Sequence, residues 1–191
     1  EKMLPQLYNK IIDELEDANY RGRICFNYSS EPTLHPELPA IIKYARKVKR
    51  AKLYIYTNGD FLNRESFDQL KKSGADHFVI TQHGENIPEP LSKMLHSLSL
   101  DEKKHVTFQT LREYKLFNRG IPGLIPEERR AIPNPCFIAD EPTILVNGDV
   151  VCGNDPLGSN IFGNVRERSI MEVWNSLLYK TTRDEVRHGQ F

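Results

Sequence analysis

Two cysteines, Cys136 and Cys152, are the residues whose type and spacing point most clearly to chemistry. Fifteen residues separate them, and the intervening stretch contains the turn Asn147-Gly148 between apolar segments, a β-hairpin signal. Because a hairpin folds the chain back on itself, two sulfurs distant in sequence can meet at one point. An iron–sulfur cluster usually takes four thiolates, so the pair predicts half of such a site. Two small buried hydrophobes or a structural zinc pair are the alternatives.

The chain has only one other cysteine, Cys25. It lies in an apolar segment, 23–28, that is typical of a short strand, and we expect it to be a core residue. Three cysteines are too few, and odd in number, for a disulfide scaffold. The count therefore predicts a reducing, cytoplasmic setting.

The elements that must position these residues follow from hydrophobic periodicity. Segments with strand character begin at roughly 25–30-residue intervals, with amphipathic helical patterns between them, which is typical of βαβ units and a parallel sheet. The predicted strands are 23–28, 52–57, 76–81 and 104–111, and the predicted helices are 4–15, 36–48, 61–73 and 90–98.

Polar residues stand at the carboxyl end of each predicted strand. The segments that carry them are Ser29-Ser30-Glu31, Thr57-Asn58, Thr81-Gln82-His83 and Thr110-Leu111-Arg112. Ligands of parallel sheets bind beyond the carboxyl ends of the strands, so these groups are expected to converge on one rim. Ordinary turn chemistry is the alternative, above all for Asn58 before Gly59. His83 is either a proton relay near neutral pH or a solvated loop histidine.

The chain changes character after residue 117. Residues 118–135 are rich in glycine and proline and predict a linker or active-site loop. The hairpin follows, and then a helix over 169–178 that begins with a capping box, Ser169 with Glu172. We therefore divide the chain into 1–117, the linker 118–135 and a small module, 136–191.

The stretch I-C-F-N-Y-S-S-E-P-T-L-H-P-E-L carries a family resemblance. It resembles a segment of the radical S-adenosylmethionine (SAM) superfamily that usually reads Gly-Gly-Glu-Pro. Here Ser29-Ser30 stands in place of the two glycines, while Glu31 and Pro32 are kept. The next strand, L-Y-I-Y-T-N-G-D-F-L, is similar to that superfamily's T-N-G strand end.

The C-terminal stretch resembles the shortened SPASM module called twitch, which holds an auxiliary iron–sulfur cluster. The matching residues occur in the family's order: Cys136, Gly148, Cys152, Asn154-Asp155, Gly163-Asn164 and Ser169 to Ser176. The resemblance implies that Cys136 and Cys152 are ligands of an auxiliary [4Fe–4S] cluster. It covers nearly the whole chain.

The resemblance implies an α/β fold, a partial (β/α)6, TIM-barrel-like barrel followed by a small β-hairpin and helix module. It also implies a catalytic [4Fe–4S] cluster held by a CxxxCxxC loop, a motif that this chain lacks. We expect the chain to be a fragment, inactive by itself, with that loop upstream of Glu1 and further cysteines beyond Phe191.

The family also implies roles for residues at the strand ends. Ser29, Ser30 and Glu31 would contact the amino group of SAM, and Thr57 and Asn58 its ribose or methionine part. Thr81 and Gln82 would contact SAM or the substrate. Arg119 would bind a carboxylate group of SAM or of the substrate. Arg112 is the alternative residue for this role.

By resemblance, the full-length protein is an enzyme that cleaves SAM with a reduced [4Fe–4S] cluster and abstracts a substrate hydrogen through a 5′-deoxyadenosyl radical. The expected reaction is oxidation or epimerisation of a sugar or cyclitol, with a reductase or flavodoxin-type protein as electron donor. Three alternatives stay open: a peptide-modifying radical SAM enzyme, a degenerate barrel that binds a partner without catalysis, and a zinc-stabilised hydrolase or transferase.

Composition bears on two other classes of partner. Lys plus Arg and Asp plus Glu both number 26, so the formal net charge is zero. This gives no support for nucleic-acid binding, which favours a basic surface. We expect no membrane partner either, since no apolar run approaches the roughly 20 residues of a membrane span.

Overall fold

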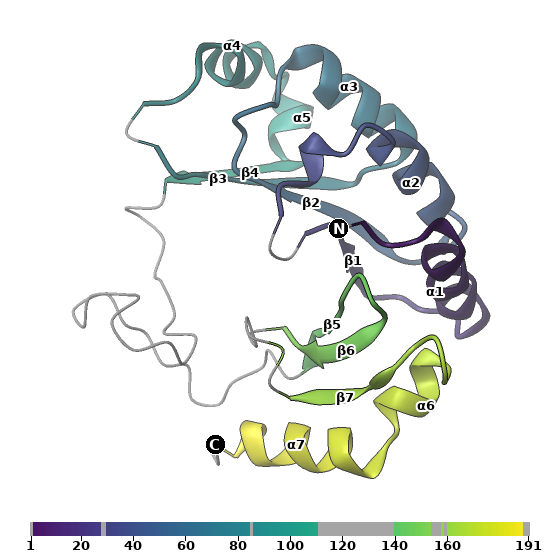
Figure 1. Ribbon diagram of the computed structural model, residues 1–191. Helices are drawn as coiled ribbons and strands as arrows, with labels where there is room; N and C mark the ends of the chain where they lie inside the picture. The colour runs from purple at the N-terminus through teal and green to yellow at the C-terminus, as the bar shows by residue number, and fades with distance from the viewer. Residues whose placement is uncertain are drawn as a thin grey trace. The chain divides into compact units, whose positions relative to one another are not determined.

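The computed structural model describes residues 2–27, 30–84, 86–110, 140–153, 158 and 160–188 (Figure 1). The chain forms two compact units. One comprises Asn19–Tyr114, and the other comprises Glu1–Ala18 together with Lys115–Phe191.

The unit 19–114 contains a four-stranded sheet in the order β1-β2-β3-β4. Its strands are β1 (Arg23–Cys25), β2 (Lys52–Thr57), β3 (His77–Gln82) and β4 (Val106–Thr110), and every neighbouring pair is parallel. The predicted α/β class with a parallel sheet is confirmed. The closure of this sheet into a (β/α)6 barrel stays a prediction.

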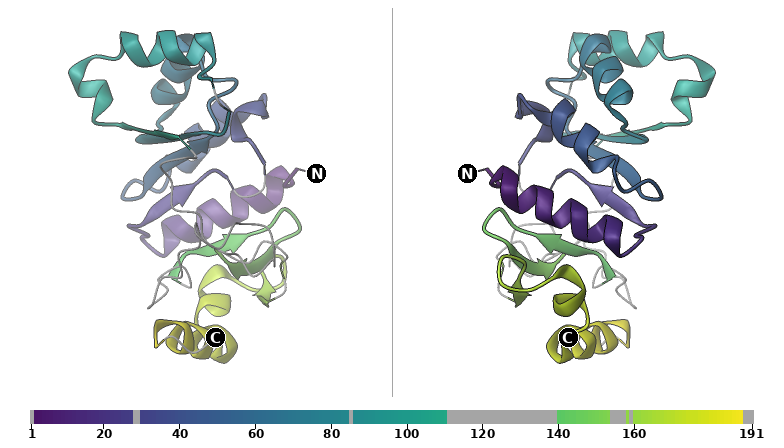
Figure 2. Two further views of the ribbon diagram at one scale, coloured as in Figure 1. Left: turned by 90° about the vertical axis from the view of Figure 1, so that its left-hand side faces the viewer. Right: turned by 90° about the vertical axis from the view of Figure 1, so that its right-hand side faces the viewer.

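The helices of this unit lie along one face of the sheet (Figures 1 and 2). They are η1 (Pro32–Leu34), α2 (Leu38–Ala45), α3 (Arg64–Ser73), α4 (Glu89–Ser97) and α5 (Leu100–Lys103). Strand residues alternate accordingly: Leu53, Ile55, Phe78 and Ile80 are fully buried. The intervening residues of β2 and β3 are only partly buried, which places them on the opposite face of the sheet.

The prediction that Cys25 is a core residue is wrong, because its side chain is exposed. Strand β1 is three residues long and lies at the edge of the sheet. Its register pairs Ile24 with buried Leu53 and Cys25 with Tyr54. Cys25 therefore lies on the sheet face away from the helices. The alternation of apolar and polar residues in one short strand does not show which of its two faces is buried.

In the other unit, the described residues form a three-stranded antiparallel sheet and three helices. The strands are β5 (Pro142–Ile144), β6 (Asp149–Cys152) and β7 (Ile161–Asn164), in the order β5-β6-β7. The helices are α1 (Pro5–Asp17), α6 (Ile170–Trp174) and α7 (Leu177–Arg187). The predicted hairpin is present as β5 and β6, whereas strand β7 was not predicted.

The single helix predicted over 169–178 is wrong. The capping box of Ser169 and Glu172 is present, but α6 ends after five residues at Asn175. The Ser176 hydroxyl then accepts a hydrogen bond from the Tyr179 backbone N–H and caps a second helix, α7. A serine in this position starts a new helix because its hydroxyl competes for backbone donors.

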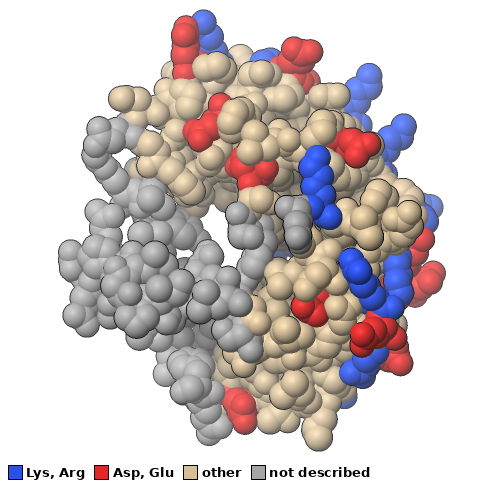
Figure 3. Space-filling view, viewed as in Figure 1, with Lys and Arg blue, Asp and Glu red and all other residues tan. Residues whose placement is uncertain are grey.

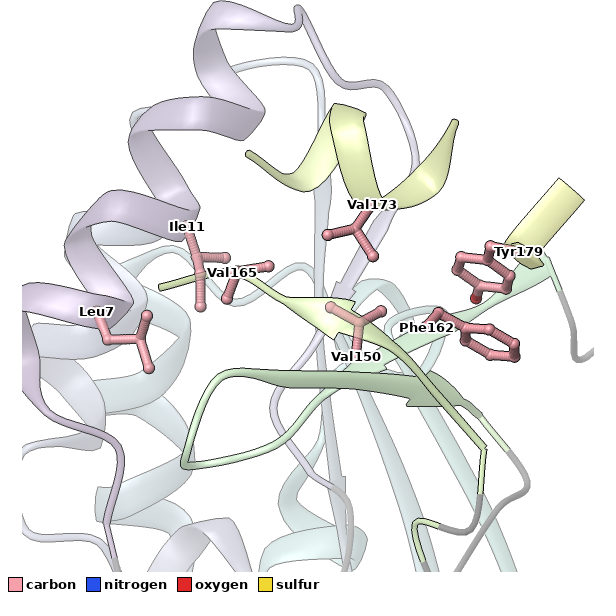
Figure 4. Close-up of a cluster of buried hydrophobic side chains, with 7 residues drawn as sticks. All are labelled: Leu7, Ile11, Val150, Phe162, Val165, Val173 and Tyr179. Atoms are coloured by element: carbon pink, nitrogen blue, oxygen red, sulfur yellow. The ribbon is translucent and has the colours of Figure 1, made fainter. Parts of the chain in front are cut away.

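Helix α1 packs against the C-terminal sheet of its unit. Leu7 and Ile11 share one buried cluster with Val150, Phe162, Val165, Val173 and Tyr179 (Figure 4). Lys10 Nζ donates to the Val165 carbonyl oxygen at 2.7 Å, and Glu14 Oε2 accepts from the Ile170 backbone N–H at 2.7 Å. The sequence alone assigned this helix to the N-terminal part, and the proposed boundaries 1–117, 118–135 and 136–191 remain a prediction.

Gly148 sets the turn between β5 and β6. Its φ is +93°, and a Cβ there would lie 2.7 Å from Asn164 Oδ1. We predict that Gly148→Ala lowers the free energy of unfolding by about 1–2 kcal/mol, the cost of a left-handed conformation for a residue with a side chain. Thermal unfolding followed by circular dichroism measures this. Gly84→Ala is the control, since Gly84 is not in the left-handed region, and equal melting temperatures for the two variants would contradict the prediction.

Two surface properties bear on partners. On the face seen in Figure 3, basic and acidic side chains of the described residues stand interspersed. Within the described part of the chain, no helix has the length and apolar character needed to cross a bilayer.

Candidate SAM and iron–sulfur sites

Glu31 connects the ends of two neighbouring strands. Its Oε1 accepts from Thr33 N at 3.0 Å, from Thr33 Oγ1 at 2.5 Å and from Thr57 Oγ1 at 2.7 Å. Its Oε2 accepts from the Asn58 backbone N–H at 2.8 Å. The carboxylate therefore holds the segment after β1 against the end of β2, at the carboxyl edge of the parallel sheet.

The four hydrogen bonds are unevenly shared by the two carboxylate oxygens. A carboxylate offers about four acceptor sites, about two on each oxygen. Oε1 carries three bonds and is saturated, whereas Oε2 carries one and keeps an acceptor site. Glu31 can therefore hold the turn and still receive one further donor.

Asn58 forms the turn that the alternative interpretation predicts. Its Nδ2 donates to Asp60 Oδ2 at 2.8 Å, and its Oδ1 accepts from Asp60 N at 3.0 Å. Gly59 follows at φ +81° and donates its N–H to Thr57 Oγ1 at 3.0 Å. The Asn58 side chain is thus engaged within the turn, while Thr57, 5% exposed, is buried between Glu31 and Gly59.

Thr81 and Gln82 lie at the end of the next strand. Thr81 Oγ1 accepts from Gln109 Nε2 at 3.0 Å, which joins β3 to β4. Gln82 is 3% exposed. Its Oε1 accepts from the Gly84 N–H and its Nε2 donates to the Asn86 carbonyl oxygen at 3.4 Å, so it orders the segment that follows β3.

The structure thus brings Glu31, Thr57 and Asn58 into direct contact and puts Thr81 and Gln82 at the same edge of the sheet, through the register of β2 with β3. Ser30 and His83 are exposed at that edge. Ser29, Arg112, Arg119 and Cys136 lie outside the described residues. Their predicted roles in binding SAM, substrate or a cluster stay predictions.

The face of the parallel sheet that points away from its helices carries a row of aromatic and polar side chains, which the sequence analysis did not single out. The rings of Tyr54 and His77 stack with centroids 4.9 Å apart, and His77 Nε2 lies 2.9 Å from Thr107 Oγ1. Burial, and after it the charge of His105, lowers the pKa of His77. The alternation of β2 and β3 would have indicated this row, since these residues are out of phase with the buried ones.

Cys152 ends strand β6 and is half-buried. It pairs with Pro142 across the hairpin and packs against the buried cluster of the C-terminal unit. Among the described residues no group of three or more His, Cys, Asp or Glu side chains gathers in a way that could hold a metal ion. Cys152 is therefore the one predicted cluster ligand within the described part of the chain.

Two residues of α7, in the unit that contains Cys152, were not singled out by the sequence analysis. Tyr179 is fully buried, and burial, followed by the charge of Cys152, raises the pKa of its phenol. Its Oη has no hydrogen-bond partner among the described residues. Arg183, 6% exposed, lies with its guanidinium carbon 3.8 Å from the Trp174 ring centroid. The spacing Trp174, Tyr179, Arg183 was the available signal.

These donor sets fit the two groups that the resemblance implies. At the strand ends, the Glu31 carboxylate is held by four hydrogen bonds and keeps one acceptor site, which suits a cationic ammonium. At the hairpin, the half-buried Cys152 thiol packs against the same cluster as Tyr179, whose buried hydroxyl has no partner among the described residues. Sulfur is the ligand that iron–sulfur clusters take.

Comparison with known proteins supports the same assignment. Residues 136–190 match the SPASM iron–sulfur cluster-binding domain family. The chain is also 27% identical over 191 residues to an S-adenosyl-L-methionine-dependent 2-deoxy-scyllo-inosamine dehydrogenase of Niallia circulans, covering 98% of this chain and 76% of that protein.

Solved structures extend the similarity to three dimensions. The crystal structure of BtrN in complex with AdoMet and 2-DOIA matches with a TM-score of 0.89 at 26% identity, covering 99% of this chain and 76% of that one. BtrN in an open conformation matches with a TM-score of 0.74 at 23% identity, covering 98% and 75%, which shows likeness of fold. The resemblance to the radical SAM superfamily with a SPASM-like module is confirmed.

Proposed function

We propose that this chain, a radical SAM protein with a SPASM-like auxiliary module, belongs to a dehydrogenase that oxidises a hydroxyl group of an aminocyclitol. The observation that carries the proposal is one similarity that spans both units. It runs through 98% of the chain to a SAM-dependent 2-deoxy-scyllo-inosamine dehydrogenase, whereas a match of the auxiliary module alone would leave the reaction open.

Glu31 is the residue that we assign to the amino group of SAM. Its Oε2 keeps an acceptor site beyond the bond from the Asn58 N–H. A carboxylate that receives an ammonium forms a charge-assisted hydrogen bond, which is shorter and stronger than a neutral one. The Thr33, Thr57 and Asn58 donors fix the orientation of the carboxylate before SAM binds, so little ordering cost remains.

The other strand-end residues would then shape the rest of the SAM site. The Asn58 turn holds the end of β2, and Gln82 orders the chain after β3. Ser29 and Ser30 would lie beside the amino group, and Thr81 beside SAM or the substrate. Arg119 would pair with a carboxylate, for which its planar guanidinium is suited.

The C-terminal unit would hold the auxiliary cluster through Cys136 and Cys152. When bound, SAM and the reduced catalytic cluster supply hydrogen-atom abstraction, and the auxiliary cluster supplies an acceptor for the second electron of an alcohol oxidation. The chain's own tasks are to orient SAM and substrate and to exclude water, since the cofactors carry the difficult chemistry. A reductase or flavodoxin-type donor and a reducing, cytoplasmic location belong to the same proposal.

The test uses the full-length gene product, reconstituted anaerobically with iron and sulfide and supplied with SAM, a reductant and 2-deoxy-scyllo-inosamine. We expect a product lighter by two hydrogens, seen by mass spectrometry. A product of unchanged mass and inverted stereochemistry would show that the enzyme is an epimerase and would contradict dehydrogenation. No turnover of the cyclitol, with both clusters present, would overturn the proposed substrate class, and a panel of peptides would then be screened.

A further inference from the structure

Tyr179 carries a polar atom that packing does not explain. Its side chain is fully buried, and its Oη has no hydrogen-bond partner among the described residues. Buried hydroxyls almost always have a partner, because leaving one unpaired forfeits its solvation. A phenylalanine would fill the same space without this cost, so the hydroxyl requires an explanation of its own.

The ring of Tyr179 is held in place on several sides. Phe162 stacks on it with ring centroids 4.0 Å apart and planes 3° from parallel (Figure 4). Trp174 meets it edge-on at 5.2 Å, and the guanidinium carbon of Arg183 lies 4.7 Å from its centroid. Arg183 is itself fixed, because its Nη1 donates to the Trp174 carbonyl oxygen at 2.9 Å. The hydroxyl therefore cannot swing out to water.

A buried water does not supply the missing partner in the described part of the chain. The small cavity beside the ring has apolar walls, formed by Pro142, Ile144, Val150, Ile170, Trp174 and Tyr179. A water needs two to four polar partners to be stable in a protein interior, and this cavity offers none.

Cys152 takes part in the packing around Tyr179. Tyr179 is a buried member of one hydrophobic cluster, and the partly buried Cys152 packs against the same cluster. Cys152 also pairs across the hairpin with Pro142, which lines the cavity beside the Tyr179 ring. A hydroxyl without a partner among the described residues thus packs in the same cluster as Cys152, the thiol that we assign to the auxiliary iron–sulfur cluster and that lies within the residues matching the SPASM family.

We propose that Tyr179 is a positioning residue of the auxiliary cluster, whose phenol O–H donates a hydrogen bond to a cluster sulfur, either the Cys152 thiolate or an adjacent sulfide. This inference rests on the proposed function. Hydrogen bonds to cluster sulfurs are among the determinants of reduction potential. Because a donor stabilises the more negative, reduced cluster, Tyr179 raises the potential and favours acceptance of an electron.

The test is an anaerobic redox titration, followed by electron paramagnetic resonance, of the reconstituted full-length protein and its Tyr179→Phe variant. Phenylalanine keeps the stacking on Phe162 and removes only the donor. We expect the auxiliary cluster to become harder to reduce by about tenfold in equilibrium constant, a shift of about 59 mV toward negative potential for a one-electron couple. Iron and sulfide content should stay at the wild-type level.

Tyr44→Phe is the matched control, because it removes a hydroxyl in the other unit, where Tyr44 accepts from Lys47 Nζ; its potentials should equal those of wild type. An unchanged potential in Tyr179→Phe, with both clusters present, overturns the inference and leaves the proposed function standing. If the wild-type protein binds no auxiliary cluster, the result contradicts both the role of Tyr179 and the proposed function. Circular dichroism of each variant verifies folding, and a melting shift without a potential shift would make Tyr179 a packing residue only.

Discussion

Replacing Cys152 by alanine is expected to remove the auxiliary cluster and to abolish cyclitol oxidation. The bound iron should fall by about four atoms per chain, the content of one [4Fe–4S] cluster. Oxidation of the substrate should fall by more than about 100-fold, because even changes to groups that only support metal ligands cost about 10- to 100-fold.

The physical reason lies in the position of Cys152. It ends β6 and is half-buried against the hydrophobic cluster that includes Leu7, Ile11 and Tyr179. Alanine fits this position sterically, since it removes only one sulfur from a side chain at the margin of the core. The hairpin should therefore fold, and the loss should be specific to ligation.

Cys25→Ala is the matched control. Cys25 is exposed on β1 of the other unit and lies on the sheet face away from the helices. Its replacement should leave iron, sulfide and turnover at wild-type levels, as determined by colorimetric iron and sulfide assays and by product formation. Full iron content in Cys152→Ala would show that this cysteine is not a ligand.

Glu31→Gln is expected to weaken SAM binding by about 10- to 100-fold. Hydrogen bonds to a charged group contribute about 1.5–3 kcal/mol each, and about 1.4 kcal/mol is tenfold in affinity. The amide of glutamine can accept with one end only. If its oxygen keeps the Thr33 and Thr57 donors, its NH₂ group faces the Asn58 N–H, donor against donor, and the charge that would receive an ammonium is gone.

Isothermal titration of SAM into the anaerobic protein measures this effect. Glu37→Gln is the control, because Glu37 is exposed at the start of α2 and its side chain makes no capping hydrogen bond. If Glu31→Gln lowers the melting temperature but binds SAM like Glu37→Gln, Glu31 only ties β1 to β2.

Much of the α/β unit could be predicted because its pattern is periodic. Strand β2 was predicted at its observed bounds, Lys52–Thr57, and three further strands and helices α2–α4 within a few residues. Alternating burial along a strand and the 3.6-residue period of a helix are local properties of a sequence. Parallel order then follows from the helices between the strands.

The features that escaped prediction depend on contacts between distant residues. Cys25 is exposed because β1 is an edge strand, which a single segment does not reveal. Helix α1 joins the C-terminal unit through Lys10 and Glu14, whose partners lie some 155 residues away. The separation of α6 from α7 depends on one side chain, because the Ser176 hydroxyl caps α7.

In the candidate site, too, some features could be predicted from the local sequence and others depend on contacts between distant residues. The strand-end residues were predictable as a group, because parallel register brings carboxyl ends together. The hydrogen bonds that place Glu31 at the centre of this group could not be predicted, since they join residues about 26 positions apart. Tyr179 was missed because a tyrosine at helical spacing has the pattern of a core residue, and only its unpaired hydroxyl distinguishes it.

The most direct test of radical SAM oxidation is the fate of the abstracted hydrogen. The reconstituted full-length protein would be given SAM, a reductant and ring-deuterated 2-deoxy-scyllo-inosamine, and the 5′-deoxyadenosine would be analysed by mass spectrometry. We predict one deuterium in each 5′-deoxyadenosine, formed together with the oxidised cyclitol. Absence of 5′-deoxyadenosine, or its formation without deuterium while both clusters are intact, would contradict the proposed reaction.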